Sequence, residues 1–273
     1  MAVAPAGYNY ATGAGIQSFP AAVILSIIYA LLFVAFSFKS FTRPTYVFFM
    51  MTFFCLIRLV AFILRALLAD VPSDGQNLDF FIAYQIIYNV GFFGILYSAY
   101  TLVLDRVSFA KNPPRGPISA LLRRRFLFRL ALTAAVSIGI TGSIQAISGT
   151  QQSTIDTGNT LRRVALYIFL VCSALVLLQA LILARVESSE EGYRHFASGF
   201  GGRYGLYVLI VISVLLVTRE AFFTATFSNS DVQNNEHFWY PFSALTELLA
   251  VLLFMIPDLV PSRSEIPQNS EWA

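Results

Sequence analysis

Long apolar runs separated by short polar connections dominate the sequence from residue 20 onward. An apolar helix of about 20 residues, rising roughly 1.5 Å per residue, is long enough to cross the hydrocarbon core of a bilayer. Such runs occur at about 20–38, 46–68, 80–104, 126–147, 164–183, 204–227 and 238–259. The pattern predicts an all-α membrane protein, a seven-transmembrane-helix bundle over residues 20–260, with tails at 1–19 and 261–273.

Positive charge is distributed unequally between the connections. Those on one side carry twelve Lys and Arg residues, and those on the other carry two, Arg162 and Arg163. Because positively charged loops stay in the cytosol, this asymmetry predicts an N-terminus outside or in a lumen and a cytosolic C-terminus. The first 19 residues contain no Lys or Arg, so we expect a short extramembrane tail rather than a signal peptide.

The composition also favours a multi-pass integral membrane protein, of the plasma membrane or an endomembrane. Hydrophobic residues make up 57% of the chain and charged residues 12%, compared with about 25% charged in soluble domains. Cys55 and Cys172 lie inside apolar runs, and His195 and His237 lie in opposite loops. No metal cluster and no pair of nucleophile and base has a useful spacing. We therefore expect a non-enzymatic protein without cofactor or metal, with membrane lipids rather than nucleic acid as partners.

Polar side chains inside the apolar runs are the main candidates for function, because ionisable groups in a bilayer are rarely accidental. The candidates are Arg58, Arg65, Gln85, Asn89, Arg219, Glu220 and Glu247. Helix rise places them mostly at similar depths in one outer half-layer, although they come from four spans. Since Arg219 and Glu220 point about 100° apart, we expect each to find a partner on another helix. The two glutamates would then take two of three arginines and leave one for an amide or an anionic ligand.

Several interpretations of these residues stay open. They form a site for a lipophilic or amphipathic molecule, a purely structural network of interhelical ion pairs, or a proton or ion relay. In the structural case, Arg65 extends to the outer interface with its stem in lipid. Asp105 and Arg106, at the cytosolic end of the third span, suggest instead a divergent receptor with cytosolic partners, although such a pair also suits interface anchoring.

Other patterns predict packing and interfacial contacts. The run at 126–147 is rich in Ala, Gly, Ser and Thr, which predicts close packing against neighbouring helices. Trp239 and Tyr240 precede most of the last run and predict an interfacial aromatic belt. The basic connection from Arg106 to Arg125 predicts contact with anionic lipid headgroups.

Short motifs resemble known families of membrane proteins. In the second and third spans, the stretches 53–60 (FFCLIRLV), 89–92 (NVGF) and 104–107 (LDRV) resemble uncharacterised seven-span proteins of filamentous fungi. The last two spans are similar to the fungal lipid-translocating exporter (RTA-like) family through Arg219 and the stretch 236–244 (EHFWYPFSA). Where those exporters have Asp-Ala followed by Pro-Met, this chain has Ser243-Ala244 and Thr246-Glu247. The resemblance implies a fungal polytopic protein of unsettled function, in a neighbourhood of families linked to lipid movement and drug tolerance.

Two other seven-span classes can be compared directly with the sequence. A retinal protein needs a lysine in its last span, and the only lysines are Lys39 and Lys111, so a microbial rhodopsin is excluded. An Asn-Pro-x-x-Tyr stretch and an external cysteine bridge, expected of a rhodopsin-like receptor, are also missing. Our first hypothesis is a non-enzymatic protein that binds or translocates a lipophilic or amphipathic molecule. A divergent receptor and a structural or organising membrane protein are the alternatives.

Overall fold

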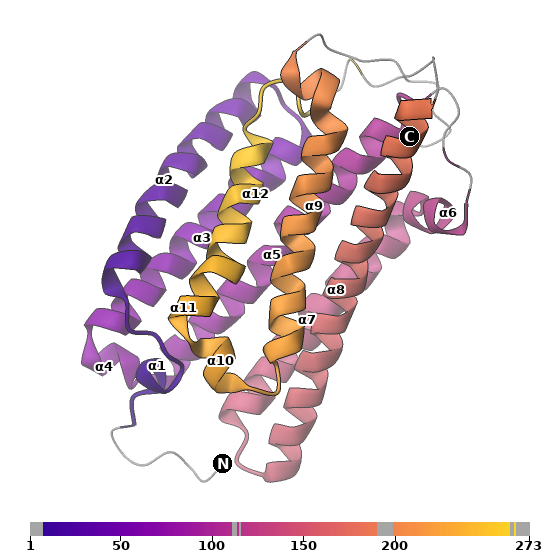
Figure 1. Cartoon of the computed structure of the whole chain (residues 1–273). Coiled ribbons are helices and arrows are strands. Elements are labelled where there is room, and N and C mark those ends of the chain that lie inside the picture. Colours follow the sequence, from indigo (N-terminus) through magenta and orange to yellow (C-terminus); the bar gives the residue numbers. More distant parts are fainter. Residues whose placement is uncertain (1–7, 111–113, 115, 190–198, 263–264, 266–273) are drawn as a thin grey trace.

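The computed structural model describes residues 8–110, 114, 116–189, 199–262 and 265 of the 273-residue chain. These residues form a bundle of long helices, with no strand among them (Figure 1). The long helices are α2 (Phe19–Thr42), α3 (Tyr46–Asp70), α5 (Leu78–Val107), α7 (Arg125–Ser148), α8 (Gln152–Ser189) and α9 (Phe200–Thr226). The last span consists of α11 (Glu236–Trp239), the π-helix η1 (Tyr240–Leu245) and α12 (Thr246–Phe254). Seven segments are thus long and apolar enough to cross a membrane, which confirms the predicted fold class.

Side-chain caps fix where individual helices begin. The Thr45 hydroxyl accepts a hydrogen bond from the backbone N–H of Phe48 at 3.3 Å, at the start of α3. The Asn77 side chain does the same for the N–H groups of Asp79 and Phe80 at the start of α5. Such caps satisfy backbone donors that have no partner inside the helix. α8 starts at Gln152, well before the apolar run that begins at residue 164. Polar residues can also be helical, so hydropathy does not mark where a helix begins.

Close packing of small residues joins α7 to α8. A Cβ atom added to Gly142 would lie 2.8 Å from both the carbonyl oxygen of Gly158 and the backbone nitrogen of Arg162. Glycine is therefore required where these two backbones meet. This contact confirms the expectation that the small-residue span packs closely against a neighbour.

α5 lies at the centre of the bundle. It packs against α3, α7, α8 and α9, and most of its residues from Gly91 to Val107 are buried. α2, by contrast, packs mainly against α3 and presents much of its surface outward. Polar residues on the inner side of α3, α5, α9 and the last span can therefore meet around α5.

Short helices cover one end of the bundle, which we call the α1 end. It holds α1 (Tyr10–Gly13), α4 (Pro72–Gly75), α10 (Ser230–Asn234) and α11 (Figure 1). The remaining short helix, α6 (Pro117–Arg123), packs against α7 and α8. Gly15 has a φ of 70°, and a Cβ atom there would lie 2.3 Å from the carbonyl oxygen of Asn234. Only glycine fits that conformation without strain, so the segment after α1 lies directly against the end of α10.

The last span departs from the single regular helix that the sequence predicts. Its π-helical part contains Pro241, which has no N–H to donate to the helix. π-helical turns are rare, and they occur frequently at functional sites. α12 then ends at Phe254.

The predicted orientation in the membrane stays a prediction. Some of the charges that it rests on, Lys111, Arg115, Arg194 and Arg263, lie outside the described residues, as do most of the tail 261–273 and His195. Both cysteines are buried and free.

Candidate functional site

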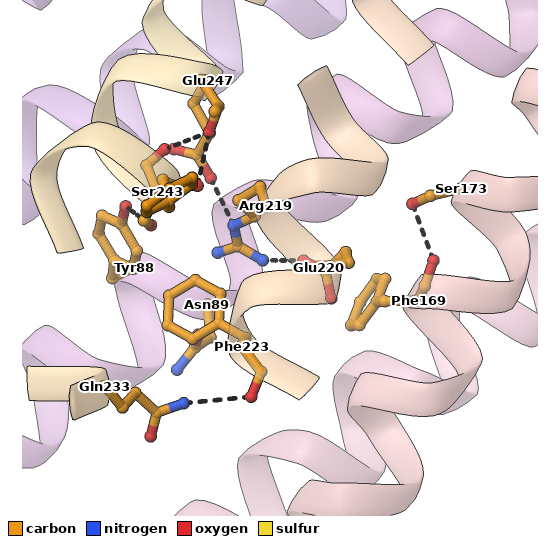
Figure 2. A network of polar contacts seen from close by, with 12 residues as sticks. Tyr88, Asn89, Phe169, Ser173, Arg219, Glu220, Phe223, Gln233, Ser243 and Glu247 are labelled. Atoms are coloured by element: carbon orange, nitrogen blue, oxygen red, sulfur yellow. Dashed lines mark hydrogen bonds and ion pairs between the residues drawn. The ribbon is translucent and has the colours of Figure 1, made fainter. Parts of the chain in front are cut away.

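A buried ion network joins α3, α9 and α12. Oε1 of Glu247 lies 2.5 Å from Nη2 of Arg58 and 3.1 Å from Nε of Arg219. Nη1 of Arg219 donates to Oε1 of Glu220 (Figure 2). None of these four side chains is more than 3% exposed. Charges that the sequence places in the second, sixth and seventh spans therefore form one network in the protein interior.

Two expectations about these charges need correction. The sequence predicts a partner on another helix for both Arg219 and Glu220, which is confirmed for Arg219 through Glu247 on α12 but wrong for Glu220, which pairs with the adjacent Arg219. The long guanidinium side chain reaches across the helix surface, so the 100° between adjacent Cβ directions does not prevent contact. The sequence also predicts one arginine without an acidic partner among Arg58, Arg65 and Arg219. Arg58 and Arg219 instead share Glu247, and Arg65 pairs with Glu236.

Aromatic rings and α5 surround the network. The guanidinium carbon of Arg58 lies 4.1 Å from the centre of the Tyr88 ring, and that of Arg219 lies 4.2 Å from the centre of Phe92. Arg58 also donates to the carbonyl oxygen of Tyr88, whose hydroxyl lies 2.7 Å from Oγ of Ser243. Cation–π contacts and hydrogen bonds offset the loss of hydration that a buried arginine suffers.

Glycine at position 91 of α5 makes room for the network. A Cβ atom there would lie 3.0 Å from Nη1 of Arg58. The close approach of α5 to α3 at this point allows the guanidinium to reach both the α5 backbone and Glu247.

Arg65 forms a second cluster nearer the α1 end. Its guanidinium donates to Oε1 of Glu236 at 2.9 Å and to the hydroxyl groups of Tyr84 and Tyr240 at 2.7 and 3.2 Å. It also lies 3.9 Å from the centre of the Trp239 ring. The Arg65 side chain is 4% exposed, so the prediction that it extends to the interface is wrong. Trp239 is only 6% exposed and packs inside the protein, which also corrects its assignment to an interfacial belt.

Sequence reasoning missed Glu236 as a partner. It stands in a polar connection, directly before an apolar run, where an acid usually faces solvent. Its Oε1 also accepts hydrogen bonds from the backbone N–H groups of Gln17 and Ser18, at 3.2 Å each. Glu236 therefore ties the segment after α1 to the last span.

A cavity lies beside these two clusters, between α5, α7, α8 and α9, and segments of the α1 end contribute to its lining. The space between its lining atoms is about 1050 Å³, a volume that includes open solvent at its mouth. The described residues that line it include three arginines, Arg65, Arg162 and Arg219, and no Asp or Glu. α5 and the segments of the α1 end supply much of the remaining lining, and the part from α7 and α8 is mainly apolar, with Ala135, Val136, Gly139, Ile140, Ala165, Leu166 and Phe169.

The structure divides the predicted site residues between this cavity and its surroundings. Four of the seven, Arg65, Gln85, Asn89 and Arg219, line the cavity. Within this lining, Nδ2 of Asn89 donates to the carbonyl oxygen of Gln85 at 2.9 Å. The other three, Arg58, Glu220 and Glu247, do not line it and instead contact Arg219 or its partner Glu247.

Arg162 is the lining residue that sequence reasoning placed elsewhere. The apolar run begins at 164, which is typical of a loop position for Arg162, but this residue lies in the third turn of α8. Arg162 can be assigned to a helix only if α8 is taken to begin before its apolar run.

Two nitrogens of Arg219, Nε and Nη2, are buried and form no hydrogen bond with any residue that the structure describes. Nε still lies within ion-pair distance of Glu247, whereas Nη2 has no such partner among the described residues. Figure 2 shows this nitrogen pointing away from both glutamates, on the side of Tyr88 and Asn89. An unsatisfied buried donor of a charged group is costly, so this atom marks a place where a ligand oxygen would be stabilised.

The proposed coupling residues of the receptor alternative belong to a separate region. Asp105 lies 3.7 Å from Nη2 of Arg125. Arg106 is 1% exposed and donates to the carbonyl oxygens of Gly201, Gly202 and Leu259 at 2.6, 3.2 and 2.9 Å. Its side chain therefore joins α5 to the start of α9 and to the segment after α12.

The fold and the buried network together define a polytopic membrane protein with a polar interior site. The chain belongs to the family described as a domain of unknown function (DUF7702), whose model matches residues 21–257 and so covers all seven spans. No curated protein and no solved structure matches the chain significantly.

Proposed function

We propose that this protein binds an amphipathic molecule with an anionic group in the cavity between α5, α7, α8 and α9, and moves it across or within its membrane without changing it chemically. The observation that carries this proposal is the lining of the cavity. It combines three arginines and no acid, among the described residues, with an apolar wall. Guanidinium groups bind carboxylate and phosphate oxygens, while an apolar wall accepts a hydrocarbon chain.

The buried glutamates have a positioning role in this proposal. Glu220 and Glu247 each contact Arg219, and Arg58 contacts Glu247. The two glutamates hold the guanidinium of Arg219 at the edge of the cavity in one orientation, which reduces the entropy lost when a ligand binds. The predicted orientation of the chain would place this cavity in the outer half of the membrane.

The resemblance of the last two spans to the fungal lipid-translocating exporters supports lipid-like ligands. Part of that resemblance, the stretch 236–244, includes Glu236, Trp239, Tyr240 and Ser243, which contact Arg65 or Tyr88. The membership in a family of unknown function leaves the transported molecule to experiment.

A structural or organising role is the second candidate, and one observation favours it. Arg58, Arg65 and Arg219 each have an acidic partner within the protein. Such pairs can hold the helices in register without taking part in ligand binding. This alternative predicts that the cavity contains no specific molecule.

Native mass spectrometry of protein purified in a neutral detergent separates the two candidates. Gly139 lines the cavity, and a Cβ atom there would meet only Ala165 at 3.4 Å, so Gly139→Leu places its side chain in the cavity. Ser137 on the same helix is exposed, and Ser137→Leu is the matched control. We expect a co-purifying anionic amphiphile on the wild type and on Ser137→Leu, and its loss from Gly139→Leu. No bound amphiphile in any of the three samples would favour the structural role.

A further inference from the structure

The charges around the cavity do not balance, and Arg162 accounts for the difference. Arg65 pairs with Glu236, and Arg219 pairs with Glu220 and Glu247. Among the residues that the structure describes, no carboxylate lies within ion-pair distance of Arg162. Its contact is with the Phe227 ring, whose centre lies 5.7 Å from the guanidinium carbon.

A count of the ionised groups gives the charge that a ligand would have to supply. The two clusters and the cavity lining contain four arginines (Arg58, Arg65, Arg162 and Arg219) and three glutamates (Glu220, Glu236 and Glu247). In their usual ionisation states these groups leave one positive charge. Arg162 is half-buried, and a charge partly removed from water without an acidic partner is unfavourable, so the cavity suits one additional negative charge.

We infer that the cavity selects a monoanionic amphiphile whose oxyanion is bound by Arg162, the lining arginine that has no acidic partner among the described residues. This inference rests on the proposed function and specifies the ligand of that site. A neutral amphiphile leaves Arg162 uncompensated, and a dianion introduces an excess negative charge beside Glu220 and Glu247. A fatty carboxylate and a phosphodiester both carry the required single charge.

The position of the arginines also orients the ligand. Arg162 precedes Ala165, Leu166 and Phe169 on the same helix, and all four line the cavity. Ala135, Val136, Gly139 and Ile140 of α7 lie beside them and continue the same wall, because α7 packs against α8 at Gly139 and Ala165. A hydrocarbon chain attached to an oxyanion at Arg162 would extend along this apolar wall, where its burial is favourable.

Trp239 provides an internal probe for the test, because its ring lines the cavity. The chain has two tryptophans, and the other, Trp272, lies outside the described residues. In a Trp272→Phe background, quenching of Trp239 fluorescence by brominated alkyl probes would report their entry. Four probes of equal chain length, each presented in neutral detergent at pH 8, vary only the headgroup: a carboxylate, a methyl phosphodiester, a primary alcohol and a phosphate monoester. The last carries almost two charges at that pH, because its second pKa is about 6.

We expect both monoanions to quench Trp239 at concentrations about tenfold lower than the alcohol and the phosphate monoester, as charge-assisted hydrogen bonds require. If the carboxylate and the phosphodiester differ from each other, the stronger one identifies the headgroup. Equal quenching by all four probes, or strongest quenching by the alcohol or the monoester, would overturn the charge selection but leave the cavity as a binding site. No saturable quenching by any probe would instead contradict the proposed function itself.

Substitution of Arg162 tests the assignment to one side chain. The neighbouring Arg163 is exposed, contacts the same Phe227 ring at 4.9 Å and does not line the cavity, so Arg163→Gln is a closely matched control. Arg162→Gln should weaken quenching by the monoanions about tenfold and leave the alcohol unchanged, whereas Arg163→Gln should change neither. Arg162→Lys keeps the charge and should retain the preference for monoanions. Loss of that preference in Arg162→Lys, or equal behaviour of the two glutamine variants, would contradict the role of Arg162.

Discussion

Glu247 on α12 and Arg58 on α3 form a fully buried ion pair, with 2.5 Å between Oε1 and Nη2. The pair joins the second span to the last, and Arg219 shares the same carboxylate oxygen. Glu247 therefore compensates two buried arginines at once. Its loss would affect the contacts of three helices.

Glu247→Gln should lower the free energy of unfolding by roughly 3–5 kcal/mol, because it leaves Arg58 without an acid in a buried site. Arg219 would keep Glu220 as a partner. Replacing both members of the pair, Arg58→Leu with Glu247→Leu, removes the unpaired charge and should recover most of that loss. Unfolding in detergent measures both variants. A double variant as unstable as Glu247→Gln would show that packing, not charge, decides stability here.

Glu236→Gln should loosen the segment after α1. The carboxylate accepts hydrogen bonds from the backbone N–H groups of Gln17 and Ser18 and forms an ion pair with Arg65. An uncharged amide in its place weakens all of these contacts. We expect amide hydrogen exchange over residues 11–18 to become at least about tenfold faster, which corresponds to roughly 1.4 kcal/mol. The exposed Asp231 on α10 provides the control, since Asp231→Asn should leave this exchange unchanged. Equal exchange in both variants would contradict the tie through Glu236.

Gly142→Ala should destabilise the bundle by about 1–3 kcal/mol, because the added Cβ would lie 2.8 Å from backbone atoms of α8 and force the two helices apart. Gly116 precedes α6, and a Cβ atom there would meet no described atom within 4 Å. Gly116→Ala should therefore change the unfolding free energy by less than about 0.5 kcal/mol. Thermal unfolding of the two variants in the same detergent gives the comparison. If both substitutions are harmless, α7 and α8 do not meet at Gly142.

Arg106→Ala should lower stability by about 3 kcal/mol, because it removes hydrogen bonds from a charged group to the carbonyl oxygens of Gly201, Gly202 and Leu259. Arg125→Ala should cost less than about 1 kcal/mol, since its pair with Asp105 is 3.7 Å long and its side chain is 43% exposed. Chemical unfolding of each variant tests the difference. A stable, folded Arg106→Ala protein would contradict the view that these hydrogen bonds hold α5 to α9 and to the segment after α12.

The seven spans could be predicted from the sequence because hydropathy is a local property. A run of apolar residues has only one favourable backbone conformation in lipid, where each N–H and C=O must be satisfied within its own helix. The apolar stretch from Phe53 to Val60, like the apolar stretches of the other spans, therefore predicts a helix, and no information about neighbouring helices is needed. The same argument does not locate helix ends, as the polar first turns of α8 show.

The sequence also indicated that Arg58, Arg65, Arg219, Glu220 and Glu247 lie in the interior, but it did not indicate that Arg106 is buried, and only the tertiary structure decided the partners of these charges. The choice of Glu236 for Arg65 depends on how α3 and α11 approach each other, and the pairing of Arg219 with Glu220 depends on side-chain conformation. Arg162 became a cavity residue because α8 extends past its apolar run and lies against α7 at Gly142. The burial of these charges follows from the cost of exposing an ionisable group to hydrocarbon, which can be read from each segment's own sequence. Pairing follows from distances between helices that are remote along the chain, and those distances are fixed only when the whole bundle packs.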